Sequence, residues 1–416
     1  MSEYPVPIVI SSWEMVREAY RSRLLRQGLY DDGVVMENVL INLHDHEHRD
    51  RRRLENPLFR RDILFNYERD SFPEVLEARL APHLKSGKLE LMEFGHGVML
   101  ELAAINAGID LDLGDTEMTE RLGQLLLTLI DGARIIHFKG DKEAKEREIT
   151  EVLNQFRDEF FKPSLERRKN LLTQLESGQV TDSEVPRDIL RVMVENIEGL
   201  DLDEGTIVRE TAFFLVTGAA TSAVTLTRTF DNIFRRISEH SEEENRLLLD
   251  AEFLQRCILE TLRLYPISPI GRRWAIGDFK LSDGTEIQDG DLVHIDMESA
   301  NRDKEIFGSS ADDFDPDRSL PEGVPLYGVS FGHGMHACIG KELAVGIDPD
   351  PDSSFDDRLF GLVGTVIREL LQLGARPDPD DPPEKDKHSE RDTFGRYPVL
   401  LTQVRDSEVL GRRVQV

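Results

Sequence analysis

Ten residues of the chain, Phe331 to Gly340 (FGHGMHACIG), place a single cysteine, Cys338, among three glycines. Gly332, Gly334 and Gly340 predict tight turns, because glycine adopts backbone conformations that other residues avoid. The apolar residues that follow predict a helix that begins just after the cysteine. A helix N-terminus favours a thiolate over a thiol, and a lone thiolate is suited to be an axial ligand of haem iron. The simpler interpretation is a buried structural cysteine in an ordinary loop.

This stretch resembles the haem-binding signature of the cytochrome P450 family, in which Phe, Gly, His or Arg, Cys and Gly recur at fixed spacing. The matching residues are Phe331, Gly334, His336, Cys338 and Gly340. The resemblance implies haem b (iron protoporphyrin IX) as cofactor, with Cys338 as the axial ligand of its iron and His336 near a propionate. It also implies a mainly α-helical fold with a small β region, the cytochrome P450 fold, as a single domain over residues 1–416.

Three further segments resemble the same family. Glu260 and Arg263 lie on an apolar-periodic stretch from Phe253 to Tyr265 and share a helix face at i and i+3. They match the family's Glu-x-x-Arg, which implies a buried ion pair near the proximal side of the haem. The segments ANRD (300–303) and FDPDR (314–318) also match the family. The resemblance implies that Arg318 joins the ion pair of Glu260 and Arg263.

The next match concerns the haem propionates. His48 and Arg52 stand at i and i+4, and they match the family's His-x-x-x-Arg, which implies two donors to a propionate. Arg272 resembles another propionate partner, with Arg273 as the alternative. Arginine suits this role because its planar guanidinium binds a carboxylate with two hydrogen bonds and stays charged.

A long helix is expected from Thr206 to about Ser238. Its middle, Phe213 to Ala220, is largely apolar on all faces, so it should be buried. Thr221 follows, and its hydroxyl is expected to bond the carbonyl of Thr217. Such a bond would distort the helix locally and open a groove.

Residues 217–222 (TGAATS) resemble the oxygen-activation segment of the family. The resemblance implies that Thr221 serves oxygen activation and that Gly218 leaves room for oxygen or substrate. Ala220 stands where the family usually has Asp or Glu. The acid and the alcohol are credited with relaying protons, so Ala220 argues against the standard proton route, and with it against ordinary monooxygenation.

Two other departures from the family follow from lengths. Only 47 residues precede His48, so we expect a fold shortened at the N-terminus, without the first helix and part of the usual sheet. The substrate pocket would then be open or closed by a partner. The helix after Cys338 is expected to be interrupted over Gly346 to Asp357 and to resume from Arg358 to Leu373.

Composition limits the class of protein. The chain has 416 residues and a formal net charge of −29, which argues against nucleic acid or an anionic membrane as a partner. No apolar run approaches the ~20 residues of a membrane span, and the N-terminus lacks a signal-peptide pattern. With only two cysteines, Cys257 and Cys338, a disulfide framework is excluded and a cytoplasmic location is expected. Cys257 is expected to be a small buried hydrophobe.

An arginine-rich patch stands against this acidic background: Arg49, Arg51, Arg52, Arg53, Arg60 and Arg61. In the family this region lies on the proximal face, where an electron-transfer protein docks. The resemblance therefore implies a ferredoxin or similar acidic electron donor, which a basic patch would steer. The alternative is a solvated helix face that also anchors the haem carboxylates.

Secondary structure is expected to be mostly helical. Besides the long helix, helical periodicity covers Ser12–Arg26, Glu74–Leu80, Glu117–Ile130, Lys145–Leu172 and Asp188–Ile197. Strands are expected on both sides of a hairpin turn at Asp283-Gly284 and over Leu292–Ile295.

The preferred interpretation is an oxygen-activating cytochrome P450 monooxygenase that uses molecular oxygen on a small organic molecule. One alternative is a haem-binding protein of this fold with peroxygenase-type, non-oxidative or no catalytic activity, as Ala220 suggests. The other is a metal-dependent hydrolase that uses His44, His46 and His48. On a strand these alternate imidazoles would point to one side, as metal ligands do.

Overall fold

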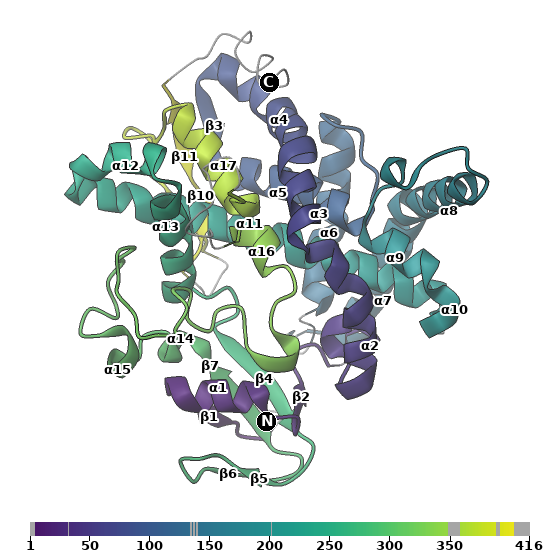
Figure 1. The fold of residues 1–416 in the computed structure, drawn as a ribbon, viewed down its shortest axis with the longest axis horizontal. Coiled ribbons are helices and arrows are strands. Elements are labelled where there is room, and N and C mark those ends of the chain that lie inside the picture. Colours follow the sequence, from purple (N-terminus) through teal and green to yellow (C-terminus); the bar gives the residue numbers. More distant parts are fainter. Residues whose placement is uncertain are drawn as a thin grey trace.

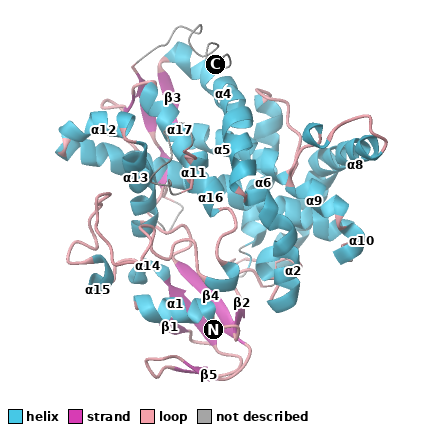
Figure 2. Cartoon of the chain, viewed as in Figure 1, coloured by secondary structure: helices cyan, strands magenta, loops and turns pink. Residues whose placement is uncertain are grey.

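The computed structural model describes residues 5–31, 33–133, 135, 138, 140–200, 202–347, 358–387 and 392–402. Most of this part of the chain is helical, and its strands form four small sheets (Figures 1 and 2). The predicted class, mainly α with a small β region, is confirmed.

The helices differ widely in length, from single turns to one of ten turns. They are α1 (Trp13–Arg21), α2 (Asp45–Glu55), α3 (Arg61–Asn66), α4 (Phe72–Ser86), α5 (Leu91–Ala107), α6 (Thr116–Ala133), α7 (Lys142–Phe156), α8 (Lys162–Glu176), α9 (Ile189–Glu195), α10 (Ile197–Leu200), α11 (Glu204–Glu239), α12 (Glu244–Leu249), α13 (Ala251–Leu264), α14 (Met297–Ala300), α15 (Lys304–Phe307), α16 (Lys341–Val345) and α17 (Gly361–Gln372).

The strands are short. They are β1 (Ile8–Ile10), β2 (Leu25–Gln27), β3 (Lys88–Glu90), β4 (Ile270–Ala275), β5 (Phe279–Lys280), β6 (Glu286–Ile287), β7 (Leu292–Asp296), β8 (Ala375–Pro377), β9 (Glu384–Lys385), β10 (Phe394–Arg396) and β11 (Pro398–Leu401). The largest sheet has the order β1-β7-β4-β2, and a second sheet has the order β3-β11-β8. These two sheets lie at opposite ends of the molecule in Figure 1. The predicted hairpin at Asp283-Gly284 is confirmed as β5–β6, and the strand predicted at Leu292–Ile295 as β7.

Two expected helices differ from the structure. The first ends at Arg21, and Leu25–Gln27 form β2 instead, because their backbone pairs with β4 and Leu25 is buried there. The stretch expected as one helix from Lys145 to Leu172 is divided into α7 and α8 by a π-turn at Arg157–Phe161. The other expected helices are confirmed within α4, α6, α9 and α11.

Helix α11 crosses the centre of the molecule and packs along α5 (Figure 1). By length and composition it is the one helix in the described chain that could cross a membrane, so the expectation of no such run does not hold for it. In this fold 67% of its most apolar window is buried. It contributes side chains to two of the three hydrophobic clusters, which places it as the central core helix.

The helix after the cysteine is interrupted, as predicted. The chain leaves α16 at Gly346 and returns to α17 at Gly361, both with a positive φ (81° and 69°). A Cβ on Gly361 would overlap the backbone nitrogen of Gly346, so the two glycines lie against each other. The amide of Ile347 donates to the carbonyl of Leu359 at 3.2 Å. Helices α16 and α17 therefore adjoin at one point, and α17 begins three residues later than predicted.

Glu68, from the turn between α3 and α4, holds the beginning of α17. Its carboxylate accepts hydrogen bonds from the amides of Phe360 at 2.9 Å and of Gly361 at 3.0 Å. These amides have no partner inside the helix, so an acidic side chain there also matches the helix dipole.

Candidate functional site

The cysteine loop, residues 331–340, is held by a hydrogen bond across it and by close packing against α1. The amide of Cys338 donates to the carbonyl of Phe331 at 2.8 Å and so closes the loop. Gly334 has a φ of 70°, and a Cβ there would overlap the carbonyl oxygen of Tyr20 at the end of α1. Only glycine satisfies both conditions. Gly340 has an ordinary φ of −89°, so its backbone conformation does not require glycine.

The thiol of Cys338 keeps accessible surface although protein atoms crowd around it. This combination is expected of a side chain that faces an internal space. Burial raises the pKa of this thiol, although the amide of Gly340 and the charges of Arg52 and Lys341 act in the opposite direction. Helix α16 begins only at Lys341 and is short. The helix predicted just after the cysteine is nevertheless present, and a bound metal ion would favour the thiolate.

Two imidazoles meet where α2 approaches the cysteine loop. The ring centroids of His48 and His336 are 4.4 Å apart, at an interplanar angle of 64°. Burial and the charge of Arg52 lower the pKa of His48 to about 4. Burial and neighbouring basic groups lower the pKa of His336 to about 3. The Nε2 atom of His336 is buried and has no hydrogen-bond partner among the described residues.

Further basic side chains surround these rings. Arg52 Nη1 donates to the carbonyl of Met335 at 3.4 Å, and Arg273 Nη1 donates to Gln27 Oε1 at 2.6 Å. The charge of Arg273 and the presence of His44 both contribute to the lowered pKa of His336. We call this group the basic cluster: His44, His48, Arg52, Arg273 and His336.

The structure decides between the two candidate arginines of β4. Successive residues of a strand point to opposite faces of a sheet, so Arg272 and Arg273 cannot both face the basic cluster. Arg273 lines the same small hollow as His44 and His336. Arg272 lies over the ring of Trp274, 5.5 Å from its centroid. The positions of the two side chains therefore favour the alternative, Arg273, over Arg272.

The basic cluster fits a ligand with two carboxylates. No described acidic side chain contributes to the pKa of His48 or His336, and Nε2 of His336 still needs a partner. Two carboxylates would supply acceptors and would raise both imidazole pKa values. Haem b carries two propionates beside its iron, so the cluster and the nearby thiol of Cys338 match its polar edge and its metal.

Glu260 and its arginines form the most completely buried ionic group of the region. Arg263 donates to both carboxylate oxygens of Glu260, at 2.7 and 2.8 Å, and Arg318 donates to one of them at 3.2 Å. Glu260 and Arg263 are 0% exposed and Arg318 is 6% exposed. The structure therefore contains the three-membered group that the sequence predicts.

Asn301 connects this group to the cysteine loop, a link that the sequence analysis did not assign. Its side chain donates to the carbonyl of Arg263 at 3.0 Å and to Ser330 at 2.8 Å, and it accepts from the amide of Val329 at 2.8 Å. Residues 329 and 330 directly precede Phe331. Glu260 and its partners thus brace the loop that carries Cys338.

One stripe of α11 keeps accessible surface in the otherwise buried middle of the helix. Its members recur at three- and four-residue spacing and share one face: Thr217, Ala220, Thr221 and Val224. The hydroxyl of Thr221 donates to the carbonyl of Thr217 at 2.6 Å, as predicted. Helix α11 continues on both sides of this bond, which is of the kind that can bend a helix locally.

Gly218 has a packing role in this structure. A Cβ at this position would lie only 3.2 Å from the Cβ of Ala103 on α5. Its small size therefore lets α5 and α11 approach closely. Gly218 also keeps some accessible surface three residues before Thr221, so the expected role of leaving room for oxygen or substrate stays a prediction. Ala220 directly precedes Thr221 on the accessible stripe and offers no titratable group.

The hydrolase interpretation is wrong. His44 is the N-cap residue of α2, and His46 and His48 lie in its first turn, with His46 exposed and His48 buried. They therefore do not alternate along a strand. Within the described residues, no group of three or more His, Cys, Asp or Glu side chains is arranged to hold a metal ion.

The arginine-rich patch is smaller than the sequence suggests. Arg51 is 6% exposed, and its Nη1 lies 2.5 Å from a carboxylate oxygen of Glu210 on α11. Glu210 also accepts the amide of Leu40 at 3.0 Å, so Arg51 ties α2 to α11. The exposed members of the patch are Arg49, Arg53, Arg60 and Arg61.

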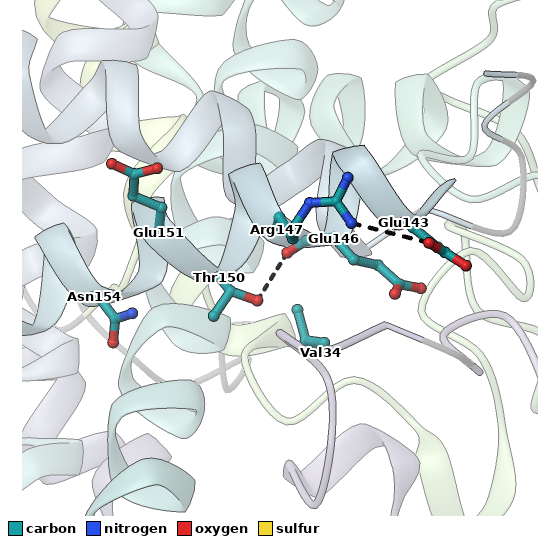
Figure 3. A pocket seen from close by; sticks show the side chains of 7 residues that line it. All are labelled: Val34, Glu143, Glu146, Arg147, Thr150, Glu151 and Asn154. Atoms are coloured by element: carbon teal, nitrogen blue, oxygen red, sulfur yellow. Dashed lines mark hydrogen bonds and ion pairs between the residues drawn. The ribbon is translucent and has the colours of Figure 1, made fainter. Parts of the chain in front are cut away.

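An open groove of 510 Å³ runs along α7, and none of its lining residues belongs to the basic cluster. Figure 3 shows the side chains that line this groove. Glu143, Glu146 and Glu151 line it together with Val34, and Arg147 lies 3.9 Å from Glu143. Its acidic lining excludes it as a site for haem carboxylates.

Comparisons with known proteins agree with this geometry. Residues 117–345 match the family model described as Cytochrome P450. The chain is 26% identical over 341 residues to probable cytochrome P450 313a1 of Drosophila melanogaster, covering 74% of this chain and 68% of that protein. It is 31% identical over 159 residues to steroid C26-monooxygenase of Mycolicibacterium smegmatis, covering 38% of this chain and 37% of that protein.

Solved structures show the same fold. P450BioI in complex with an acyl carrier protein ligated to hexadec-9Z-enoic acid superposes with a TM-score of 0.70 at 18% identity, covering 96% of this chain and 94% of that chain. CalO2 superposes with a TM-score of 0.71 at 19% identity, covering 95% of this chain and 91% of that chain.

Proposed function

Because the chain belongs to the cytochrome P450 family of haem-thiolate monooxygenases, we propose that Cys338 is the axial ligand of its haem b iron. The substrate we propose is a small organic molecule, oxidised with molecular oxygen by a single domain of residues 1–416. One observation carries this assignment. The thiol of Cys338 lies within reach of the charge of Arg52, and no described carboxylate contributes to the pKa of the neighbouring imidazoles, His48 and His336.

Haem supplies the redox chemistry when it is bound, and the protein binds, orients and tunes it. The basic cluster holds the propionates through His48, Arg52, Arg273 and His336. Loop support comes from Glu260, Arg263 and Arg318, through Asn301. Phe331 and Gly340 shape the loop on either side of the ligand.

Thr221 is the polar side chain that we propose for oxygen activation. Its proton is directed to the carbonyl of Thr217, which leaves the oxygen of the hydroxyl free to accept a hydrogen bond. Ala220 cannot deliver a proton from solvent to this position. A peroxygenase-type reaction is therefore the second candidate, because peroxide brings oxygen together with its protons.

An acidic ferredoxin is the electron donor that the exposed arginines favour. Arg49, Arg53, Arg60 and Arg61 remain at the surface of a chain with a net charge of −29, so they would steer a negatively charged partner. We propose a cytoplasmic location, since two thiols, one of them buried, suit a reducing compartment.

Ferrous-CO difference spectroscopy tests the assignment. We expect the haem-loaded protein to show the thiolate-type band and the Cys338→Ser variant to lose it. Cys257 is 1% exposed in the core, so Cys257→Ser is the matched control and should keep the band. A thiolate-type band in Cys338→Ser would falsify the assignment.

A further inference from the structure

A hollow beside the cysteine loop has a positively charged lining, although the chain as a whole is strongly negative. It lies between α1 and residues 323–333 and has a volume of 380 Å³, within the range of small-molecule sites, about 300–1,000 Å³. Its walls are largely apolar, and none of its described lining residues is acidic. Those that the argument uses are Trp13, Arg17, Val324, Tyr327 and His333.

Two cations beside this hollow contact aromatic faces. The guanidinium of Arg17 lies 5.5 Å from the ring centroid of Trp13, and Nζ of Lys341 lies 5.4 Å from that of Tyr327. Neither cation has a carboxylate partner among the described residues. A contact with an aromatic face leaves their N–H groups free to bind an anion.

His333 supplies a neutral donor. Its Nε2 accepts a hydrogen bond from Nε of Arg21 at 2.8 Å, so the ring carries its own proton on Nδ1. Burial and the charges of Arg21 and Arg17 lower the pKa of His333, which keeps the ring neutral at pH 7. The hollow thus combines cations and an N–H donor with apolar walls.

The acidic groove of Figure 3 provides the contrast. There Arg147 lies near Glu143, and two further glutamates line the groove. In that groove Glu143 offsets the positive charge of Arg147. No described acidic group offsets the charge of Arg17 in the hollow. The difference points to an anion from outside the chain.

We propose that this hollow binds a small organic acid, with its carboxylate on Arg17 and the Nδ1–H of His333. Its apolar part would lie against Trp13, Val324 and Tyr327. The site goes beyond the proposed function, because the hollow is formed by α1 and the loop before the cysteine rather than by α11.

Binding here should reach the haem through electrostatics. Lys341 contacts the ring of Tyr327, which lines the hollow. It lies three residues after Cys338 and is one of the charges that act on its thiol. A bound carboxylate would offset that positive charge. We expect the haem reduction potential to become more negative when the site fills.

Isothermal titration calorimetry of the haem-loaded protein tests the proposal with two probes of similar shape, phenylacetate and phenylacetamide. We expect phenylacetate to bind the unmodified protein, and Arg17→Gln to weaken that binding at least about tenfold. Phenylacetamide should bind at least about tenfold more weakly than phenylacetate. Arg147→Gln, in the acidic groove, is the matched control and should bind as the unmodified protein does.

The reduction potential is the second measurement. Phenylacetate should shift it to more negative values in the unmodified protein and in Arg147→Gln, with no shift in Arg17→Gln. Equal phenylacetate affinity in Arg17→Gln and the unmodified protein overturns the proposal. So does an identical Soret shift in both, because the probe would then occupy the substrate pocket. If Arg17→Gln slows only the reduction by an acidic ferredoxin, the hollow is a protein-docking surface and the proposal is wrong.

Discussion

A buried imidazole nitrogen without a hydrogen-bond partner, such as Nε2 of His336, costs a folded protein free energy. The neighbouring charges of Arg273 and Arg52 add to that cost if His336 is protonated. Carboxylates placed among these side chains would turn each unfavourable contact into a favourable one. The basic cluster is therefore energetically better suited to hold an anionic ligand than to stabilise the fold.

Haem retention follows from this arrangement. Removing one partner of a buried charged hydrogen bond costs roughly 2–5 kcal/mol, so Arg52→Ala and Arg273→Ala should transfer haem to apomyoglobin much faster than the unmodified protein. The exposed Arg61 is the control, and Arg61→Ala should keep its haem. Arg272→Ala separates the two arginines of β4 and should lose haem more slowly than Arg273→Ala. Equal transfer rates in all four variants would contradict the propionate assignment.

The missing acid at position 220 gives a second prediction. If turnover depends on oxygen and a reductant, the unmodified protein should release much peroxide and form little product per reduced cofactor. Ala220→Asp should increase that ratio when the new carboxylate finds a polar partner, since an unpaired buried carboxyl stays protonated. Product formed from added peroxide should change less. Tight coupling in the unmodified protein, with no gain in Ala220→Asp, would show another effective proton route.

At the residue scale the sequence predicted the ligand loop and the Glu260 group, because their residue types have few other uses at that spacing. It could not decide between Arg272 and Arg273, since consecutive arginines differ only in the face of the strand they occupy. The register of β4 against β2, which no local pattern specifies, decides that face. The packing role of Gly218 could not be predicted for the same reason: its neighbour Ala103 is distant in sequence.

At the scale of helices and loops, individual polar side chains hold together segments that are distant in the sequence. Glu68 holds the amides of Phe360 and Gly361 at the start of α17, and Asn301 holds the loop before Cys338. The sequence predicted most helices from their periodicity. It overextended the first one, because the pairing of Leu25–Gln27 with β4 is a long-range property.

Stability should depend on pH through Glu68. Burial raises its pKa to about 7 despite the two amides that bind it. A carboxyl whose pKa is higher in the folded than in the unfolded protein binds more protons when folded, so stability falls as pH rises from about 4.5 to about 7. In urea titrations, Glu68→Gln should remove at most about 3 kcal/mol of this fall. The exposed Glu74 is the control, and Glu74→Gln should keep the pH dependence of the unmodified protein. If the free energy of unfolding depends on pH in the same way in Glu74→Gln and Glu68→Gln, the prediction is wrong.

The whole molecule carries 80 acidic and 51 basic residues, so charge repulsion opposes its compact state. Raising NaCl from 0.1 M to 1 M shortens the Debye length from about 10 Å to about 3 Å. We expect the thermal midpoint of the haem-loaded protein to rise over this range. Sucrose of equal osmolality is the control for effects that do not depend on charge. A midpoint that falls with NaCl would show that surface ion pairs such as Arg246–Asp317 outweigh the net repulsion.

The adjoining ends of α16 and α17 have a consequence for protein engineering. Since the chain leaves at Gly346 and returns at Gly361, the fold does not set the length of what lies between them. Each doubling of a connecting segment costs only about 0.6 kcal/mol of closure entropy. An electron-transfer domain inserted between these two glycines would be tethered a few residues after the cysteine loop. Its encounter with the haem would become intramolecular, at an effective concentration in the millimolar range for short linkers.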